Sequence, residues 1–180
     1  MPRQNGRVQT PGLTLFMHTF GYRRGAYRHI RTSNRVPVEM NAVIDTRFLP
    51  CVSHDPGLKA LDGHSPEVKR ELDRHGEFST LIRVKTQELG RDIRNWCAHG
   101  RQTINIGIGS GWGRHRAVAV ADLLAWHLQR ELGDLNLPVR VYHKNWHLKE
   151  RPKPLVSVTP LLQVPVEADE RSVRLAVGQS

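Results

Sequence analysis

The feature that most constrains this fold is an apolar run that passes into a glycine-rich turn and then into a helical pattern. Residues 104–108 (Ile-Asn-Ile-Gly-Ile) have the character of a buried strand. Gly109, Gly111 and Gly113 follow, and a helical pattern begins near residues 114–116 and continues to about Leu132. This order of elements is typical of phosphate sites, because glycine lets the backbone approach an anion and the helix end offers unpaired N–H groups.

Three basic residues lie at the start of this predicted helix. Arg114, His115 and Arg116 occupy the end of a helix that ordinarily disfavours cations. Their presence together indicates that an anion binds at the same place. The predicted phosphate- or ligand-binding residues of the segment are Gly109, Ser110, Gly111, Trp112, Gly113, Arg114, His115 and Arg116.

The charge of the chain also indicates an anionic partner. The formal net charge is +10 and the pI is about 10.4, which favours nucleic acid or phosphorylated ligands. Basic and aromatic residues alternate early in the sequence, and such a segment can hold an RNA backbone and stack on bases. The alternative is a solvated basic loop without a partner. The predicted RNA-binding residues here are Tyr22, Arg23, Arg24, Tyr27, Arg28, Arg31 and Arg35.

The remaining pattern predicts an α/β domain. Strands are expected at residues 13–20, 42–48, 104–108 and 138–143, and helices from residue 65, over 78–97 and over 117–132, with a loop at 50–65. Strands alternating with helices favour a three-layer domain with a mostly parallel sheet and the glycine turn at a strand's carboxyl end. We expect a domain over residues 13–150, between flexible segments at 1–12 and 151–180.

The sequence is not expected to be that of a membrane-spanning or secreted protein. No stretch approaches the roughly 18 apolar residues of a membrane span, and the first residues lack the apolar core of a signal peptide. Cys51 and Cys97 form no pattern and are expected to be free thiols, with a single disulfide as the less favoured alternative. We therefore expect a cytoplasmic protein with no membrane partner.

Five short motifs, in one order over about residues 13–147, resemble the C-terminal domain of RapZ, the bacterial RNase adapter family, also known as the YvcJ family. The family's Ser-Phe-Gly-(Phe/Tyr)-Lys-x-Gly, Asp-x-Arg-Phe-Leu-x-Asn-Pro and Pro-x-Leu-(Arg/Lys)-x-Leu-x-Gly segments are matched in order. Its glycine loop, Gly-Cys-Thr-Gly-Gly-x-His-Arg-Ser, and its closing strand follow. The matching segments here are Thr19-Phe-Gly-Tyr-Arg-Arg-Gly25, Asp45-Thr-Arg-Phe-Leu-Pro-Cys-Val52, Pro56-Gly-Leu-Lys-Ala-Leu-Asp-Gly63, Gly109-Ser-Gly-Trp-Gly-Arg-His-Arg-Ala117 and Val139-Arg-Val-Tyr-His-Lys-Asn145.

The resemblance implies a regulatory role. RapZ proteins bind a small regulatory RNA and present it to an RNase, and their C-terminal domain binds RNA, takes part in sensing an amino-sugar phosphate and forms oligomers. It implies RNA as a partner, a homo-oligomer, and a nuclease or a full-length relative as further partners. The N-terminal domain of the family carries a Walker A loop. No such motif occurs in this sequence, so nucleotide hydrolysis of that type is not expected.

Two departures from the family loop bear on catalysis. Ser110 stands at the position of the family's cysteine, whose spacing from the arginine is similar to that of cysteine phosphatases. A serine hydroxyl needs an adjacent base to act as a nucleophile, and the sequence offers no obvious one. We therefore predict no catalytic residue. Trp112 replaces a family glycine and either stacks on a ligand or closes the pocket.

The other candidate residues are less specific. Asp45 and Arg47 either line the phosphate site or form a structural ion pair. Lys59, His143 and Lys144 are added to the predicted RNA-binding residues. His54, His64 and His75 are too far apart in sequence to indicate a metal site. Neither a metal nor a cofactor is predicted.

These observations predict an RNA- and phosphate-binding regulatory domain that also belongs to the wider nucleotide-binding class. Two alternatives stay open. One is a sensor of a phosphorylated metabolite or nucleotide that does not bind RNA. The other is a phosphatase-like enzyme that uses Ser110 or His115.

Overall fold

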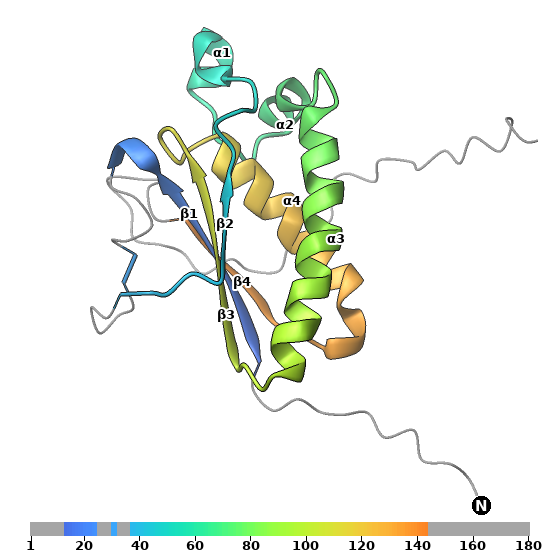
Figure 1. The fold of residues 1–180 in the computed structure, drawn as a ribbon. Helices are drawn as coiled ribbons and strands as arrows, with labels where there is room; N and C mark the ends of the chain where they lie inside the picture. The colour runs from blue at the N-terminus through green and yellow to red at the C-terminus, as the bar shows by residue number, and fades with distance from the viewer. Residues whose placement is uncertain (1–12, 25–29, 32–36, 144–180) are drawn as a thin grey trace, which may run out of the picture.

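The computed structural model describes residues 13–24, 30–31 and 37–143. These residues form one sheet with helices packed against it (Figure 1). In chain order the elements are β1 (Thr14–Gly21), η1 (Tyr22–Arg24), β2 (Ala42–Asp45), η3 (Val52–His54), α1 (Pro56–Lys59), α2 (Pro66–Leu72), α3 (Glu77–Ala98), β3 (Thr103–Ser110), α4 (Arg116–Glu131), η4 (Gly133–Leu135) and β4 (Val139–His143).

The sheet has four strands in the order β2-β3-β1-β4, and every pairing is parallel. The longest pairing joins β1 to β3, from Thr14 opposite Thr103 to Gly21 opposite Ser110. Parallel strands require crossover connections, which explains the helices between them. The prediction of an α/β domain with a mostly parallel sheet is confirmed.

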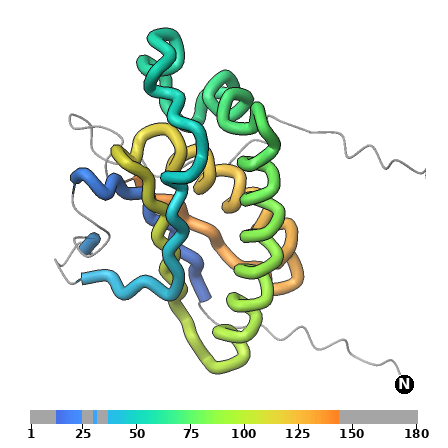
Figure 2. Tube along the Cα trace, turned by 45° about the horizontal axis from the view of Figure 1, so that its top comes forward, coloured from blue at the N-terminus to red at the C-terminus, as the bar shows by residue number. Residues whose placement is uncertain are grey.

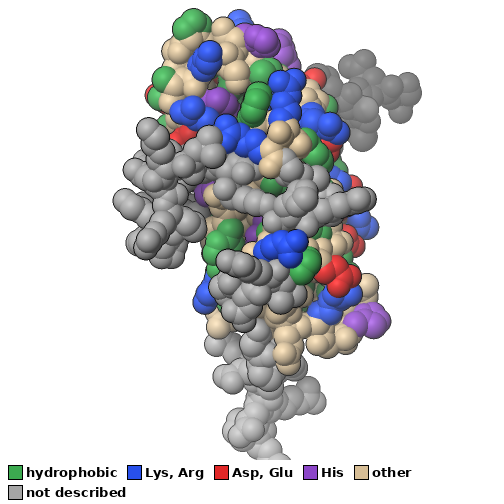
Figure 3. All heavy atoms as spheres, turned by 90° about the vertical axis from the view of Figure 1, so that its left-hand side faces the viewer, with side chains coloured by type: hydrophobic (Ala, Val, Ile, Leu, Met, Phe, Trp, Pro, Cys, Tyr) green, Lys and Arg blue, Asp and Glu red, His purple; other side chains and the backbone are tan. Residues whose placement is uncertain are grey.

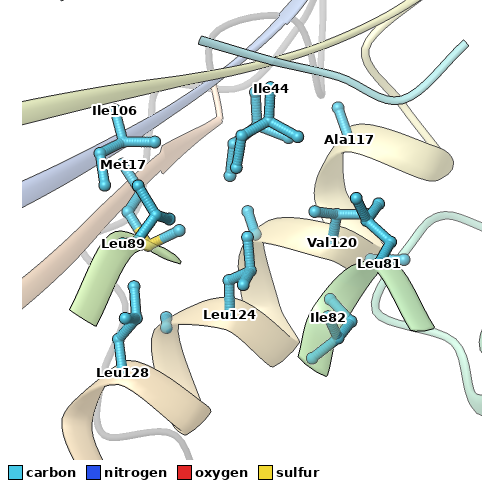
Figure 4. Packing of buried hydrophobic residues seen from close by; sticks show 14 of the residues in the cluster. Met17, Ile44, Leu81, Ile82, Leu89, Ile106, Ala117, Val120, Leu124 and Leu128 are labelled. Atoms are coloured by element: carbon cyan, nitrogen blue, oxygen red, sulfur yellow. The ribbon is translucent and has the colours of Figure 1, made fainter. Parts of the chain in front are cut away.

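The core lies between the sheet and the helices α3 and α4. Alternate residues of each strand point to the helices, because successive side chains of a strand point to opposite faces. In Figure 4, Met17, Ile44 and Ile106 face Leu124 of α4 and Leu89 of α3. Fully burying such a side chain stabilises the fold by about 1.5–3 kcal/mol. The packing of these side chains against α3 and α4 therefore holds the strands, and with them the strand ends, in place.

The described α-helices that pack on the sheet lie on one of its faces. Helix α4 contacts β1, β3 and β4, and α3 and α2 pack against α4. A three-layer arrangement would place helices on both faces. Within the described residues, the opposite face carries no α-helix (Figure 1) and instead shows stacked rings of Phe16, His18 and Tyr142.

Three predictions of local structure were wrong. Strand β3 continues to Ser110 rather than ending at residue 108, so Gly109 and Ser110 lie in the strand and the turn begins after them. Strand β2 ends at Asp45 rather than at residue 48, because the Asp45 carboxylate accepts the backbone N–H of Arg47 and turns the chain. The predicted loop at 50–65 contains α1. Asp55 caps this helix by accepting the backbone N–H groups of Gly57 and Leu58, which is a common way to satisfy a helix start.

The long helix α3 has two unlike faces. Phe78, Leu81 and Ile93 are buried, whereas Arg83 and Arg91 are exposed. This spacing is that of an amphipathic helix on a protein core. No helix in the described part of the chain has both the length and the apolar character that a membrane crossing requires.

The turn after β3 is packed directly on the end of β1. Gly113 has a φ of 77°, and a Cβ atom there would lie 2.7 Å from the backbone nitrogen of Gly21 and from the carbonyl carbon of Phe20. Both the positive φ and the close backbone approach require glycine. The position of this turn is therefore fixed by the β1–β3 pairing beneath it.

We predict that Gly113→Ala destabilises the protein more than an alanine substitution at a glycine whose only constraint is a positive φ. The left-handed backbone costs about 1–2 kcal/mol for a residue with a Cβ, and overlap with β1 adds about 1–3 kcal/mol. The matched control is Gly76→Ala, since Gly76 has a φ of 73° and open space at its Cβ position. Urea unfolding measures both, and equal losses would contradict the packing of the turn.

Candidate anion-binding site

The predicted site residues meet where the parallel strands end. Gly21 of β1 lies opposite Ser110 of β3, and Asp45 of β2 lies opposite Gly109. Figure 2 shows the turn after β3 beside the segment that follows β2. In parallel α/β sheets this edge is the usual place for ligands. Folding therefore brings together the glycine turn, η1 and the segment after β2.

The glycine turn is held closed on its inner side. The backbone N–H of Gly113 donates to the Ser110 Oγ atom at 2.9 Å, and the carbonyl of Gly111 accepts the backbone N–H of Arg23 at 3.0 Å. The backbone N–H of Gly113 is therefore directed into the protein and not toward a ligand. Its hydrogen bond is made within the protein, because the turn is packed against β1.

The two arginines of the turn are fixed by backbone carbonyls. Arg114 donates to the carbonyl of Ala60 at 2.6 Å. Arg116 donates through Nη1 to the carbonyls of Arg47 and Leu49, at 2.7 and 2.9 Å. Both guanidinium groups thus hold neighbouring loops, a role that the sequence did not predict.

Part of the Arg116 guanidinium remains available to a ligand. Its Nη2 atom lies 3.5 Å from the place of a Cβ at Gly111, so it borders the glycine turn. Within residues 13–24, 30–31 and 37–143, Nε and Nη2 of Arg116 have no acceptor. A guanidinium that is anchored at one end and open at the other is a preorganised donor for an oxyanion.

Five predicted residues line one small pocket. The pocket is a shallow depression that opens to solvent. The predicted lining residues are Ser110, Trp112, Arg114, His115 and Arg116. Cys51, Val52 and Ser53 complete the wall and were not predicted. Their position just after β2 was the available signal, because chain that leaves a parallel strand at this edge borders the same site.

His115 enters the pocket as a neutral imidazole at pH 7. Burial lowers the pKa of His115, and the positive charge of Arg114 lowers it further. The Nε2 atom is buried and, in the described part of the chain, has no hydrogen-bond partner. Such a polar atom is costly to bury alone.

Asp45 and Arg47 form the ion pair that was one of their two predicted roles. Arg47 donates through Nε and Nη2 to the Asp45 carboxylate at 2.6–3.0 Å. The hydrogen bond from Arg47 lowers the pKa of Asp45. The Arg47 guanidinium also lies 4.3 Å from the ring centre of Tyr22. The charge of Arg47 is thereby shared with Asp45 rather than directed to the pocket.

Trp112 presents an exposed indole ring at the edge of the pocket. The residue is 51% exposed, and the guanidinium carbons of Arg23 and Arg24 lie 5.3 and 5.4 Å from the ring centre. These distances are those of cation–π contacts. Two cations and an aromatic face thus adjoin the anchored Arg116.

The other predicted RNA-binding residues are scattered. Lys59 and Arg31 are exposed. Figure 3 views the molecule from the left-hand side of Figure 1, and most of the Lys and Arg side chains visible there lie in its upper part. His143 is half-buried on the helix side of the sheet, against Thr19 and His64, because it ends an inward-facing row of β4. The remaining predicted residues, Tyr27, Arg28, Arg35 and Lys144, lie outside the described residues, as do the predicted flexible segments 1–12 and 151–180.

Comparison with known proteins identifies relatives of this arrangement. Residues 13–147 match the sequence model of a family described as the RapZ C-terminal domain. A nucleotide-binding protein of Nitrosomonas europaea is 34% identical over 115 residues, 64% of this chain and 36% of that protein. Nucleotide-binding proteins of Rubrobacter xylanophilus and Paramagnetospirillum magneticum are 32% and 33% identical, over 71% and 73% of this chain.

The match is confined to part of each relative. The chain covers 36–40% of the length of these three proteins. The resemblance inferred from the five short motifs is confirmed by the family match.

We predict that Ser110 supports the turn rather than acting as a nucleophile. Ser110→Ala leaves the buried N–H of Gly113 without its acceptor, which costs about 1–3 kcal/mol of unfolding free energy. The control is Ser53→Ala, because Ser53 lines the same pocket and has no hydrogen-bond partner among the described residues. Thermal and urea unfolding compare the two variants. Equal stability of Ser110→Ala and the parent protein would overturn the assignment.

Proposed function

Because this chain belongs to the RapZ C-terminal domain family, we propose that it is a regulatory domain that binds RNA at the carboxyl edge of its sheet. A phosphate of the RNA occupies the pocket between Ser110 and Arg116, and an adjacent base stacks on Trp112. The observation that carries the proposal is the anchored Arg116 with its open Nη2 beside the exposed indole ring of Trp112.

The phosphate half of the proposal rests on preorganisation. The carbonyls of Arg47 and Leu49 hold Arg116 before any ligand arrives, so little side-chain entropy is lost on binding. His115 adjoins the same pocket, and an anion there favours its protonated form. A charge-assisted hydrogen bond from Arg116 contributes about 1.5–3 kcal/mol.

The base half of the proposal rests on Trp112. An aromatic ring stacks on any base, and the loss of one such contact costs about 1–3 kcal/mol. Arg23 and Arg24, whose guanidinium groups lie over the ring, supply charge for the neighbouring phosphates. The relatives are named nucleotide-binding proteins, which agrees with recognition of a nucleotide unit rather than of phosphate alone.

The proposed domain binds without catalysis. The Ser110 side chain is almost fully buried, with 2% of the residue exposed, and its Oγ accepts a backbone N–H. An activated serine needs a base within hydrogen-bond reach of that oxygen. None is present among the described residues. We place this activity in the cytoplasm, in keeping with the free thiols of Cys51 and Cys97. The homo-oligomer is what membership of the RapZ family implies.

Arg116→Ala is expected to weaken binding of a 5′-phosphorylated oligoribonucleotide by about 1.5–3 kcal/mol, the value of a lost charge-assisted hydrogen bond. Fluorescence anisotropy at fixed ionic strength measures the affinity, since phosphate binding is strongly salt-dependent. Arg130→Ala is the matched control, because it removes the same charge from the far end of α4. Arg116→Lys keeps the charge without the fixed fork of donors.

The two alanine variants separate local recognition from general electrostatics. The proposal predicts a large loss for Arg116→Ala and a small one for Arg130→Ala. Similar losses in both variants, with far-ultraviolet circular dichroism showing both folded, would contradict a specific phosphate position at Arg116.

Trp112→Ala is expected to weaken oligoribonucleotide binding by about 1–3 kcal/mol and to leave binding of inorganic phosphate unchanged, because only the base contacts the ring. Trp112→Phe retains part of the stacking and serves as the conservative variant. Titration with a sugar phosphate is run in parallel. Tight binding of the sugar phosphate with no detectable binding of RNA would replace this proposal by the metabolite-sensor alternative.

A further inference from the structure

Three side chains of the metal-ligating type lie together on the helix side of the sheet. His64 precedes α2, Asp122 belongs to α4 and His143 ends β4. One ligand atom from each residue lies within 4.8 Å of the other two, and all three residues are half-buried. The chain thus brings together two imidazoles and a carboxylate from three separate elements.

The contacts within this cluster are close. The Nδ1 atom of His64 lies 2.6 Å from Oδ2 of Asp122, and the rings of His64 and His143 meet edge to face with centres 5.0 Å apart. Two histidines and an aspartate form a donor set that Zn²⁺ uses when one coordination position stays open. The mutual distances require only small side-chain movements to surround one ion.

Each end of the cluster has an outer partner that orients a ligand. The Thr19 hydroxyl lies 3.0 Å from Nδ1 of His143, which leaves Nε2 as the ligand atom. The Lys69 ammonium donates to Oδ2 of Asp122 at 3.2 Å. Metal-binding imidazoles and carboxylates are commonly held by such hydrogen bonds. Lys69 also balances the negative charge of Asp122, so this partly buried carboxylate is stabilised even when no metal ion is bound.

The protonation of the two imidazoles differs. Burial lowers the pKa of His143 to about 4, so this ring is neutral at pH 7, the form that binds metals. For His64, burial opposes the charge, but the hydrogen bond and charge of Asp122 outweigh it and raise the pKa.

We propose that His64, Asp122 and His143 bind a divalent transition-metal ion, with Zn²⁺ the best match to these ligands. The ion joins the start of α2, the body of α4 and the end of β4, and its remaining position is open to water or to another donor. This proposal revises the expectation of no metal. It was hidden in the sequence because the ligands are far apart along the chain.

The test is metal binding by the full chain after removal of metals with a chelator. Titration calorimetry with Zn²⁺ is expected to show one ion per chain, and Co²⁺ in the same site is expected to give the visible absorption of a four-coordinate ion. His64→Ala and His143→Ala are expected to weaken Zn²⁺ binding by about tenfold or more. His75→Ala is the control, because His75 is exposed.

A conservative variant separates the loss of a metal ligand from the loss of the fold. Asp122→Asn keeps the shape of the side chain and is expected to weaken Zn²⁺ binding while far-ultraviolet circular dichroism stays unchanged. Loss of the Co²⁺ absorption in this folded variant would support the site. No stoichiometric Zn²⁺ binding by the parent chain, or binding equal in the His64, His143 and His75 variants, would overturn it and leave a proton-bridged ion pair. Arg116→Ala retains Zn²⁺ binding, so failure of the RNA proposal and of this one can be told apart.

Discussion

The parallel pairing of β1 with β3 is the constraint on which the remaining structure depends. It sets Gly21 opposite Ser110, and the turn after β3 then fits against β1 only if Gly21 and Gly113 have no Cβ. A Cβ at Gly21 would lie 2.6 Å from the Trp112 carbonyl group, and one at Gly113 would meet the backbone of β1. The pocket therefore takes its shape from a buried backbone contact, and the exposed Trp112 precedes a glycine, Gly113, that is packed inward against β1.

The cations of the turn serve the fold and the proposed ligand at once. Arg116 reaches across to the carbonyls of residues 47 and 49, which follow a strand that ends at Asp45 because its side chain forms a turn. Without a guanidinium these carbonyls would lose their donor, a cost comparable to that of a missing hydrogen bond. This explains why cations are tolerated at the start of α4, where the helix dipole disfavours them. The charge is offset by carbonyl oxygens before an anion binds.

Sequence patterns predicted the elements that depend on local periodicity and missed those that depend on side-chain contacts across the fold. The apolar runs of β1 and β3 and the helices α3 and α4 follow from alternation and from 3.6-residue spacing. The short α1 was predictable from Asp55-Pro56, a cap followed by a favourable first residue. The pairing of Arg116 with distant carbonyls and the meeting of His64 with His143 were not, because only the tertiary fold joins these positions. The one-sided placement of the described helices likewise depends on packing.

Residues 62–64 connect the histidine cluster to the backbone of two residues that line the pocket, Arg114 and His115. The Gly63 backbone donates to the carbonyl of Arg114 at 3.1 Å, and a Cβ at Gly63 would overlap the carbonyl oxygen of His115, so this segment lies tightly against the start of α4. The next residue, His64, contacts Asp122 on the same helix. An ion on His64 and an anion at Arg116 would therefore order the same stretch of backbone from its two sides. Coupling between two ligands requires that each favour one state of a shared element, and here that element is the contact of residues 62–64 with α4. The strength of this coupling depends on how mobile residues 62–64 are when both sites are empty. If the segment is already rigid, binding of the first ligand does not lower the entropy cost of binding the second.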